Sequence, residues 1–175
     1  MSTNYYTDCH SGHYTLINPG KYLPDLPPPV FKSSWEEKIC IACDVNDFIT
    51  RWGYEPFEIS YYSPLYMKQS IYIPDVYVEC RYANGVEQRY LLEIKPVAYS
   101  VLPKEPKAPG PNVKDTRRWD NYRKKKAAFD RKTMDVMVNY AKWEAAEQWC
   151  KAHNINWLIL NEKNMHGLFD SKTVI

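Results

Sequence analysis

Apolar and polar positions alternate in the middle of the chain and then change to a helical repeat. Alternation over residues 55–62, 70–80 and 86–96 predicts three β-strands, because successive strand side chains point to opposite faces. Residues 117–152 carry apolar side chains every three or four positions, which predicts one long helix. A short apolar run over residues 156–160 predicts a final, buried strand. The apolar stripe of the long helix comprises Met134, Val138, Ala141, Ala145 and Trp149.

A shorter helix is predicted ahead of the strands. Ser33 and Glu36 have the Ser-x-x-Glu spacing of a capping box, with Ser33 as the N-cap. This helix is expected to end at Cys43 or Asp44. The order is therefore helix, three strands, long helix and strand. That order predicts an α/β fold, with a mixed central sheet flanked by helices.

Two further segments lie outside these elements. Residues 1–32 are polar and then rich in proline, which predicts an extended N-terminal arm. Residues 33–175 are then expected to form a single domain. Within it, residues 101–116 hold four prolines, a glycine and several lysines, which predicts a mobile loop.

Composition narrows the classes of protein to which the chain can belong. A length of 175 residues and a hydrophobic content of 45% indicate a globular domain with a core of its own. No apolar run approaches the roughly 20 residues of a membrane span, so no membrane partner is expected. The sequence also lacks a glycine-rich phosphate loop, so no nucleotide is expected.

Positive charge is concentrated in one part of the chain. The formal net charge is only +2, yet residues 104–132 carry eleven Lys or Arg against four acids. Such a concentration favours contact with a DNA backbone, and the alternative is a solvated helix face. The candidate DNA-binding residues are Arg117, Arg118, Arg123, Lys124, Lys125 and Lys126.

Three charged residues interrupt the predicted strands. Asp75 and Glu93 are hard oxygen ligands of the kind that Mg²⁺ prefers, and Lys95 shares a strand face with Glu93. Two carboxylates and an amine around a metal suit phosphodiester hydrolysis, whereas the alternative is a surface hairpin with a cross-strand ion pair. Mg²⁺ is the expected cofactor, with Mn²⁺ as an allowed substitute.

The turn of the hairpin decides whether the two acids meet. A two-residue Asn84-Gly85 loop would pair Asp75 with Ile94 and separate Asp75 from Glu93. A three-residue loop with a left-handed Gly85 would pair Asp75 with Glu93 directly. Function requires the second register, or a bulge near the proline that precedes Asp75.

Glu36 is a further candidate acid. Its helical position shares a face with apolar residues, so its carboxylate is expected to point toward the sheet. The alternative is that Glu36 only completes the capping box. Glu37 is the adjacent choice and is expected to face solvent.

The sequence around these residues resembles a known nuclease family. Pro74-Asp75 followed by Glu93-Ile94-Lys95 looks like the PD-(D/E)xK motif, and the element order resembles the restriction-endonuclease-like core. More narrowly, five blocks resemble the head-completion nuclease of T-even-type tailed phages, which is related to the TnsA-like transposon endonucleases. In chain order they are NPGKY (18–22), KSSWEEK (32–38), YIPDVYVE (72–79), YLLEIKP (90–96) and NYAKWEAAEQWC (139–150).

The resemblance implies roles for individual residues. Asp75 and Glu93 match the metal-binding acids, Lys95 matches the catalytic lysine, and Glu36 rather than Glu37 matches the acid of the first helix. Lys142 lies in the Asn-x-x-Lys-Trp block, where we expect it to contact a DNA phosphate.

The resemblance also implies a biological role. It implies a metal-dependent nuclease that acts on double-stranded DNA in phage head completion, before head–tail joining, and trimming of packaged DNA is one role it allows. Phage head or portal proteins are the expected partners, in the cytoplasm of a bacterial host, with association with the virion left open. The alternatives are a structural DNA-binding or portal-docking protein that needs no catalysis, and a TnsA-like subunit that cuts transposon ends.

The Cys40-x-x-Cys43 spacing is one that is found in zinc sites. Both cysteines lie inside a predicted helix with apolar neighbours, and no second metal-binding pair follows at a suitable spacing. We therefore expect buried free thiols rather than a zinc centre.

Overall fold

A computed structural model describes residues 10–165 and shows a four-stranded central sheet between two helices. In the order β3–β6–β7–β8, the strands are Ile49–Tyr54, Val76–Arg81, Glu87–Ile94 and Asn156–Leu160. The first three are antiparallel neighbours and β8 pairs parallel to β7, so the sheet is mixed. The α/β fold predicted from the sequence is confirmed.

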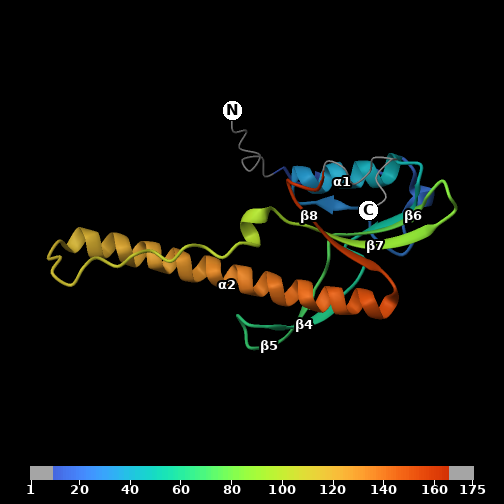
Figure 1. The fold of residues 1–175 in the computed structure, drawn as a ribbon. Helices are drawn as coiled ribbons and strands as arrows, with labels where there is room; N and C mark the ends of the chain where they lie inside the picture. Colours follow the sequence, from blue (N-terminus) through green and yellow to red (C-terminus); the bar gives the residue numbers. More distant parts are fainter. Residues whose placement is uncertain (1–9, 166–175) are drawn as a thin grey trace.

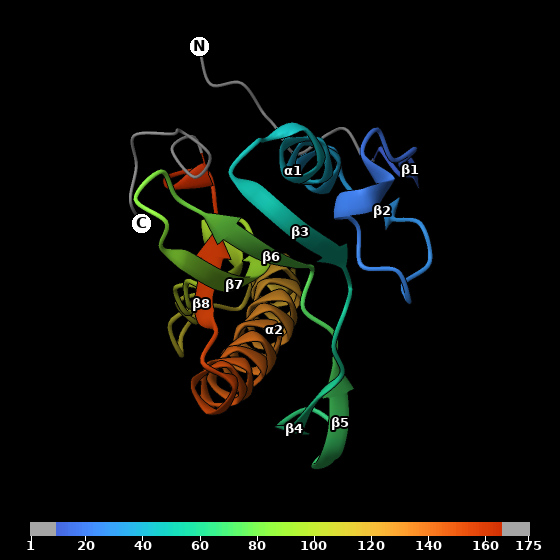
Figure 2. The ribbon, with the colours of Figure 1, turned by 90° about the vertical axis from the view of Figure 1, so that its right-hand side faces the viewer.

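The two helices cover opposite faces of this sheet (Figure 2). Helix α1 (Ser34–Val45) has Ser33 as its N-cap, and the Ser33 hydroxyl accepts from the Glu36 N–H, as the capping pattern predicted. Helix α2 (Thr116–His153) lies on the other face. It ends where Asn154 adopts the left-handed conformation.

The strand assignments from the sequence were wrong in two places. The first strand of the sheet is β3, whereas the predicted strand over residues 55–62 belongs instead to a separate hairpin. That hairpin consists of β4 (Ile59–Ser63) and β5 (Lys68–Tyr72). The predicted strand over residues 70–80 is two strands, because Pro74 has no N–H to donate and the chain leaves one sheet for the other there.

The described part of the N-terminal arm packs into the core. It contains the short strands β1 (Gly12–His13) and β2 (Val30–Phe31), which pair with each other, and the 3₁₀ turn η1 (Pro19–Lys21). Tyr14 and Tyr22 both meet the ring of Trp52 edge-on. Trp52 is fully buried on β3, so the arm completes the layer that covers this strand.

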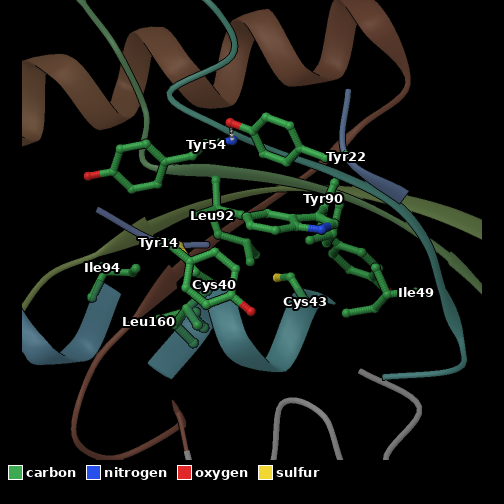
Figure 3. Packing of buried hydrophobic residues seen from close by; sticks show 14 of the residues in the cluster. Tyr14, Tyr22, Cys40, Cys43, Ile49, Tyr54, Tyr90, Leu92, Ile94 and Leu160 are labelled. Carbon is green, nitrogen blue, oxygen red and sulfur yellow. Dashed lines mark hydrogen bonds between the residues drawn. The ribbon is translucent and has the colours of Figure 1, made fainter. Parts of the chain in front are cut away.

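The core between α1 and the sheet contains the two cysteines of the Cys-x-x-Cys pattern (Figure 3). Cys40 and Cys43 are fully buried free thiols among apolar side chains. Burial raises the pKa of both thiols above the usual value. Because zinc binds the thiolate form, this environment disfavours the zinc alternative.

Helix α2 is anchored only along its second half. Its buried residues begin at Val136, and this half packs between the sheet and the β4–β5 hairpin. The first half projects from the body of the molecule (Figure 1). The 3₁₀ turn η2 (Val97–Tyr99) and the segment over residues 101–115 connect β7 to α2, and the segment runs outward along the projecting half to the start of the helix. Mobility of this segment stays a prediction.

Candidate active site

The register of the β6–β7 hairpin brings Asp75 and Glu93 together. Val76 pairs with Leu92, so the same register places Asp75 directly opposite Glu93. It arises from a three-residue loop, in which the Tyr82 N–H donates to the Val86 carbonyl over 2.9 Å and Gly85 has a φ of 80°. This is the register that the proposed chemistry required.

Asp75 sits where β5 ends and β6 begins. Its Oδ2 accepts from the Ile94 N–H at 2.6 Å, and its carbonyl accepts from the Glu55 N–H at 2.8 Å. These bonds tie Asp75 to the ends of β7 and β3. The carboxylate is thereby fixed against the strand that carries Glu93.

The carboxylates of Asp75 and Glu93 lie close together in a buried place, where their negative charges repel each other. Glu93 is only 4% exposed. Burial, followed by the charge of Glu93, raises the pKa of Asp75 well above its ordinary 3.8, while the hydrogen bond from Ile94 opposes the change. Two carboxylates in such a place gain most from a cation that both can reach.

Two neighbours partly compensate the charge of Glu93. The Lys95 ammonium lies 3.7 Å from Oε1 of Glu93, on the same face of the strand as predicted. The Tyr72 hydroxyl donates to the other oxygen, Oε2. Tyr72 is buried at the end of β5, so the β4–β5 hairpin also positions the site.

Glu36 lies at the start of α1 and is held by local hydrogen bonds. It accepts from the Ser33 hydroxyl at 2.9 Å and from the Lys32 N–H at 2.8 Å, as the capping box requires. It also accepts from the Tyr54 hydroxyl at 2.6 Å, and its charge contributes to the raised pKa of Asp75. Glu36 therefore caps the helix and faces the pair of acids, whereas Glu37 lies 3.8 Å from His10.

The three predicted metal ligands do not form one tight cluster. Across residues 10–165, no three His, Cys, Asp or Glu side chains lie close enough to hold a metal together. Asp75 and Glu93 are adjacent, and Glu36 stays with its capping partners. Mg²⁺ commonly takes one or two protein carboxylates and fills its other positions with water and substrate oxygens. The adjacent pair therefore fits such an ion.

Lys142 reaches the same site from α2. Its Nζ lies 5.5 Å from the centre of the Tyr72 ring and 5.9 Å from that of Tyr61. Burial and the neighbouring charge of Lys95 lower the pKa of Lys142. The structure thus places Lys142 beside the acids and apart from the remaining basic residues predicted to bind DNA.

The other predicted DNA-binding residues lie on the projecting half of α2, and the structure divides them. Arg123 pairs with Asp120 at 2.8 Å, and Lys126 pairs with Glu105 and with Asp130. The remaining four are exposed side chains of the same half-helix. They are Arg117, Arg118, Lys124 and Lys125.

Sequence reasoning missed several residues around the acids. Tyr54 and Tyr72 donate to Glu36 and Glu93, yet 15 tyrosines in the chain leave no pattern that singles them out. Glu55 was also missed. It has a φ of 48°, which is uncommon for a residue other than glycine, and its side chain pairs with Lys32.

A family comparison agrees with the geometry of the site. A model of the TnsA-like endonuclease N-terminal domain matches residues 46–162. The chain belongs to the TnsA-like endonuclease family. The matched segment of this TnsA-like chain contains Asp75, Glu93 and Lys95 but begins after Glu36.

Two further findings concern the TnsA-like chain as a whole. No curated protein matches it. Among residues 10–165, no helix combines the length and the apolar character needed to cross a bilayer.

Proposed function

We propose that this TnsA-like endonuclease is a divalent-metal-dependent DNA nuclease that completes phage heads before tails join. The observation that carries the nuclease chemistry is the pairing of Asp75 with Glu93, with the Lys95 ammonium 3.7 Å from Glu93. The phage role is supported by the five sequence blocks that resemble head-completion nucleases, including the block that carries Lys142.

The residues of the site have different roles in the proposed hydrolysis. Asp75 and Glu93 would hold the ion, which when bound supplies a Lewis acid for the phosphate and lowers the pKa of water. Lys95 donates to the phosphate oxygens and stabilises negative charge that develops there. Lys142 lies beside this pair on α2 and contacts an adjacent phosphate.

Tyr72 is a positioning residue in this mechanism. Replacing Tyr72 with Phe removes the donor to Glu93 and leaves the ring in place. Since a hydrogen-bond partner of a metal ligand typically contributes about 10- to 100-fold in metal affinity, the Mg²⁺ concentration for half-maximal cleavage should rise about tenfold. Initial cleavage rates across a Mg²⁺ series measure this change.

Tyr62→Phe is the matched control for this prediction. Tyr62 lies on the same hairpin, is 52% exposed, and should leave the Mg²⁺ requirement unchanged. An equal requirement in both variants would rule out the positioning role of Tyr72.

The nuclease activity is tested with the purified chain. Linear and circular duplex DNA are incubated with Mg²⁺, with and without EDTA. We expect cleavage that EDTA stops, and cutting of the circular substrate distinguishes endonucleolytic from exonucleolytic action. If the isolated chain does not cleave and a recombinase partner restores cleavage, the TnsA-like role at transposon ends is the better account.

The head-completion role requires a separate test. Phage heads are assembled with the natural chain or with Asp75→Ala protein and then mixed with tails. We expect fewer infectious particles with the variant. Full joining by heads that contain the variant would instead support a structural DNA-binding or portal-docking role.

A further inference from the structure

The projecting half of α2 presents one face toward the side of the catalytic site. At about 100° per residue, Arg117, Lys124 and Arg131 lie within about 20° of the direction of Lys142. Lys142 is directed toward Lys95, Tyr61 and Tyr72. A row of three exposed cations therefore extends outward in line with the site.

The opposite face of the same half-helix is covered by the connecting segment. The Trp119 indole N–H donates to the Val113 carbonyl at 2.9 Å, and the Lys126 ammonium lies 2.9 Å from Glu105. Trp119 also meets Tyr122 edge-on. The segment consequently occupies the side away from Lys142 and leaves the basic row exposed.

A groove at the inner end of the basic row is lined by Tyr99, whose ring lies near Lys95 of the site. It lies between η2 and α2, has a volume of about 520 Å³, and is lined by Tyr99, Arg131, Lys132 and Asp135 among others. The ring of Tyr99 has the Lys95 ammonium 5.9 Å from its centre. Asn139 fixes this turn through a bond of 3.2 Å from its side-chain amide to the Tyr99 carbonyl. Arg131 and Lys132 thus line the same groove as Tyr99, whose ring lies near Lys95.

We propose that this open face of α2 and its groove bind duplex DNA on one side of the cut, with Arg131 and Lys132 as the next phosphate contacts outward from Lys142. The proposal rests on the proposed nuclease function for the position of the cut. From Arg117 to Lys142 the helix spans about 38 Å at ~1.5 Å per residue. That length matches about eleven base pairs at ~3.4 Å each. The affinity of this face should therefore depend on the length of the duplex and not on its base sequence.

Duplex DNA is the occupant that these observations favour. The row offers cations at intervals along a straight, exposed rod, and these cations can contact phosphates where a duplex backbone crosses the rod. Asp135 is the one acid among the groove residues named above, and it lies beside two cations.

The test compares two double variants that lose equal charge. Arg131→Ala with Lys132→Ala removes the groove contacts, and Arg81→Ala with Lys151→Ala removes cations that pair with acids away from the projecting half-helix. Binding of the full chain to a labelled 24-base-pair duplex is followed by fluorescence anisotropy in EDTA, across a series of salt concentrations.

We expect the groove variant to bind at least about tenfold more weakly, with a salt dependence shallower by about two counterions. The paired-cation variant should stay within about twofold of the natural chain. Equal losses in both variants, or no loss in the groove variant, would overturn the proposal.

Duplex length supplies an independent readout. Affinity should rise as the duplex is lengthened to about eleven base pairs on one side of the site and then level off. Because EDTA prevents cleavage, these measurements stand apart from nuclease activity. A chain that shows this binding but never cleaves with Mg²⁺ contradicts the proposed function alone, whereas a chain that cleaves but binds without preference for this face contradicts the inference alone.

Discussion

Replacing Asp75 with Asn should reduce Mg²⁺-dependent cleavage of duplex DNA by at least about a thousandfold, because one of two adjacent metal ligands loses its charge. The side chain keeps its shape, and its amide oxygen can still accept from the Ile94 N–H. Cleavage rates of the natural chain and of the variant at saturating Mg²⁺ measure the effect. Glu79→Gln on β6, the strand that follows Asp75, removes an acid outside the site and should retain activity.

The same substitution should stabilise the metal-free fold. The pKa of Asp75 is raised in the folded state above its ordinary value of 3.8. Its contribution to the free energy of unfolding is therefore present below pH 3.8 and is lost as the pH rises through the higher pKa of the folded state. The natural chain in EDTA should therefore lose stability over that window, and Asp75→Asn should lose less. Thermal denaturation from pH 4 upward gives the comparison, and a variant that melts lower than the natural chain at neutral pH would contradict it.

The largest effect on stability is expected at Asp44, in the core beneath α1. This fully buried carboxylate accepts from the Tyr14 hydroxyl and from the N–H groups of Ile17 and Asn18, so it ties the N-terminal arm to the helix. Asp44→Ala leaves three donors without their acceptor. We expect a loss of about 3–4 kcal/mol in the free energy of unfolding, measured by urea denaturation.

Asp44→Asn separates the lost charge from the lost acceptor. With its amide oxygen in the place of Oδ2, the side chain keeps the bonds from Tyr14 and Ile17 and loses the bond from Asn18, so we expect an intermediate loss of about 1–2 kcal/mol. A loss below about 1 kcal/mol in the alanine variant would show that the arm does not depend on Asp44.

Local patterns predicted the elements whose signals are short in range. The capping box of Ser33 depends on residues close in sequence and is present as expected. The turn at Gly85 is equally local, and it forms the register that the chemistry required of the two left open. Strand β3 was missed because buried and exposed residues do not alternate along it. Arg51 is exposed, whereas Trp52, Gly53 and Tyr54 are buried in succession, so the pattern of a half-buried strand is absent.

The environment of the acids depends on contacts that no local pattern encodes. The pairing of Asp75 with Glu93 requires one of the two hairpin registers that the sequence left open, and the structure has that register. Tyr72 and Glu93 are 21 residues apart in the chain. The hydroxyl of Tyr72 reaches Glu93 only because the β4–β5 hairpin folds against α2. Likewise, the division of the basic residues into two faces depends on which side of α2 the connecting segment covers.

A diffraction experiment on crystals soaked in Mn²⁺ tests the central claim most directly. The account predicts an anomalous peak within direct coordination distance of both the Asp75 and the Glu93 carboxylates, absent from crystals of Asp75→Asn. Mn²⁺ bound only elsewhere, with these two carboxylates unchanged, would contradict a metal-dependent site at this pair.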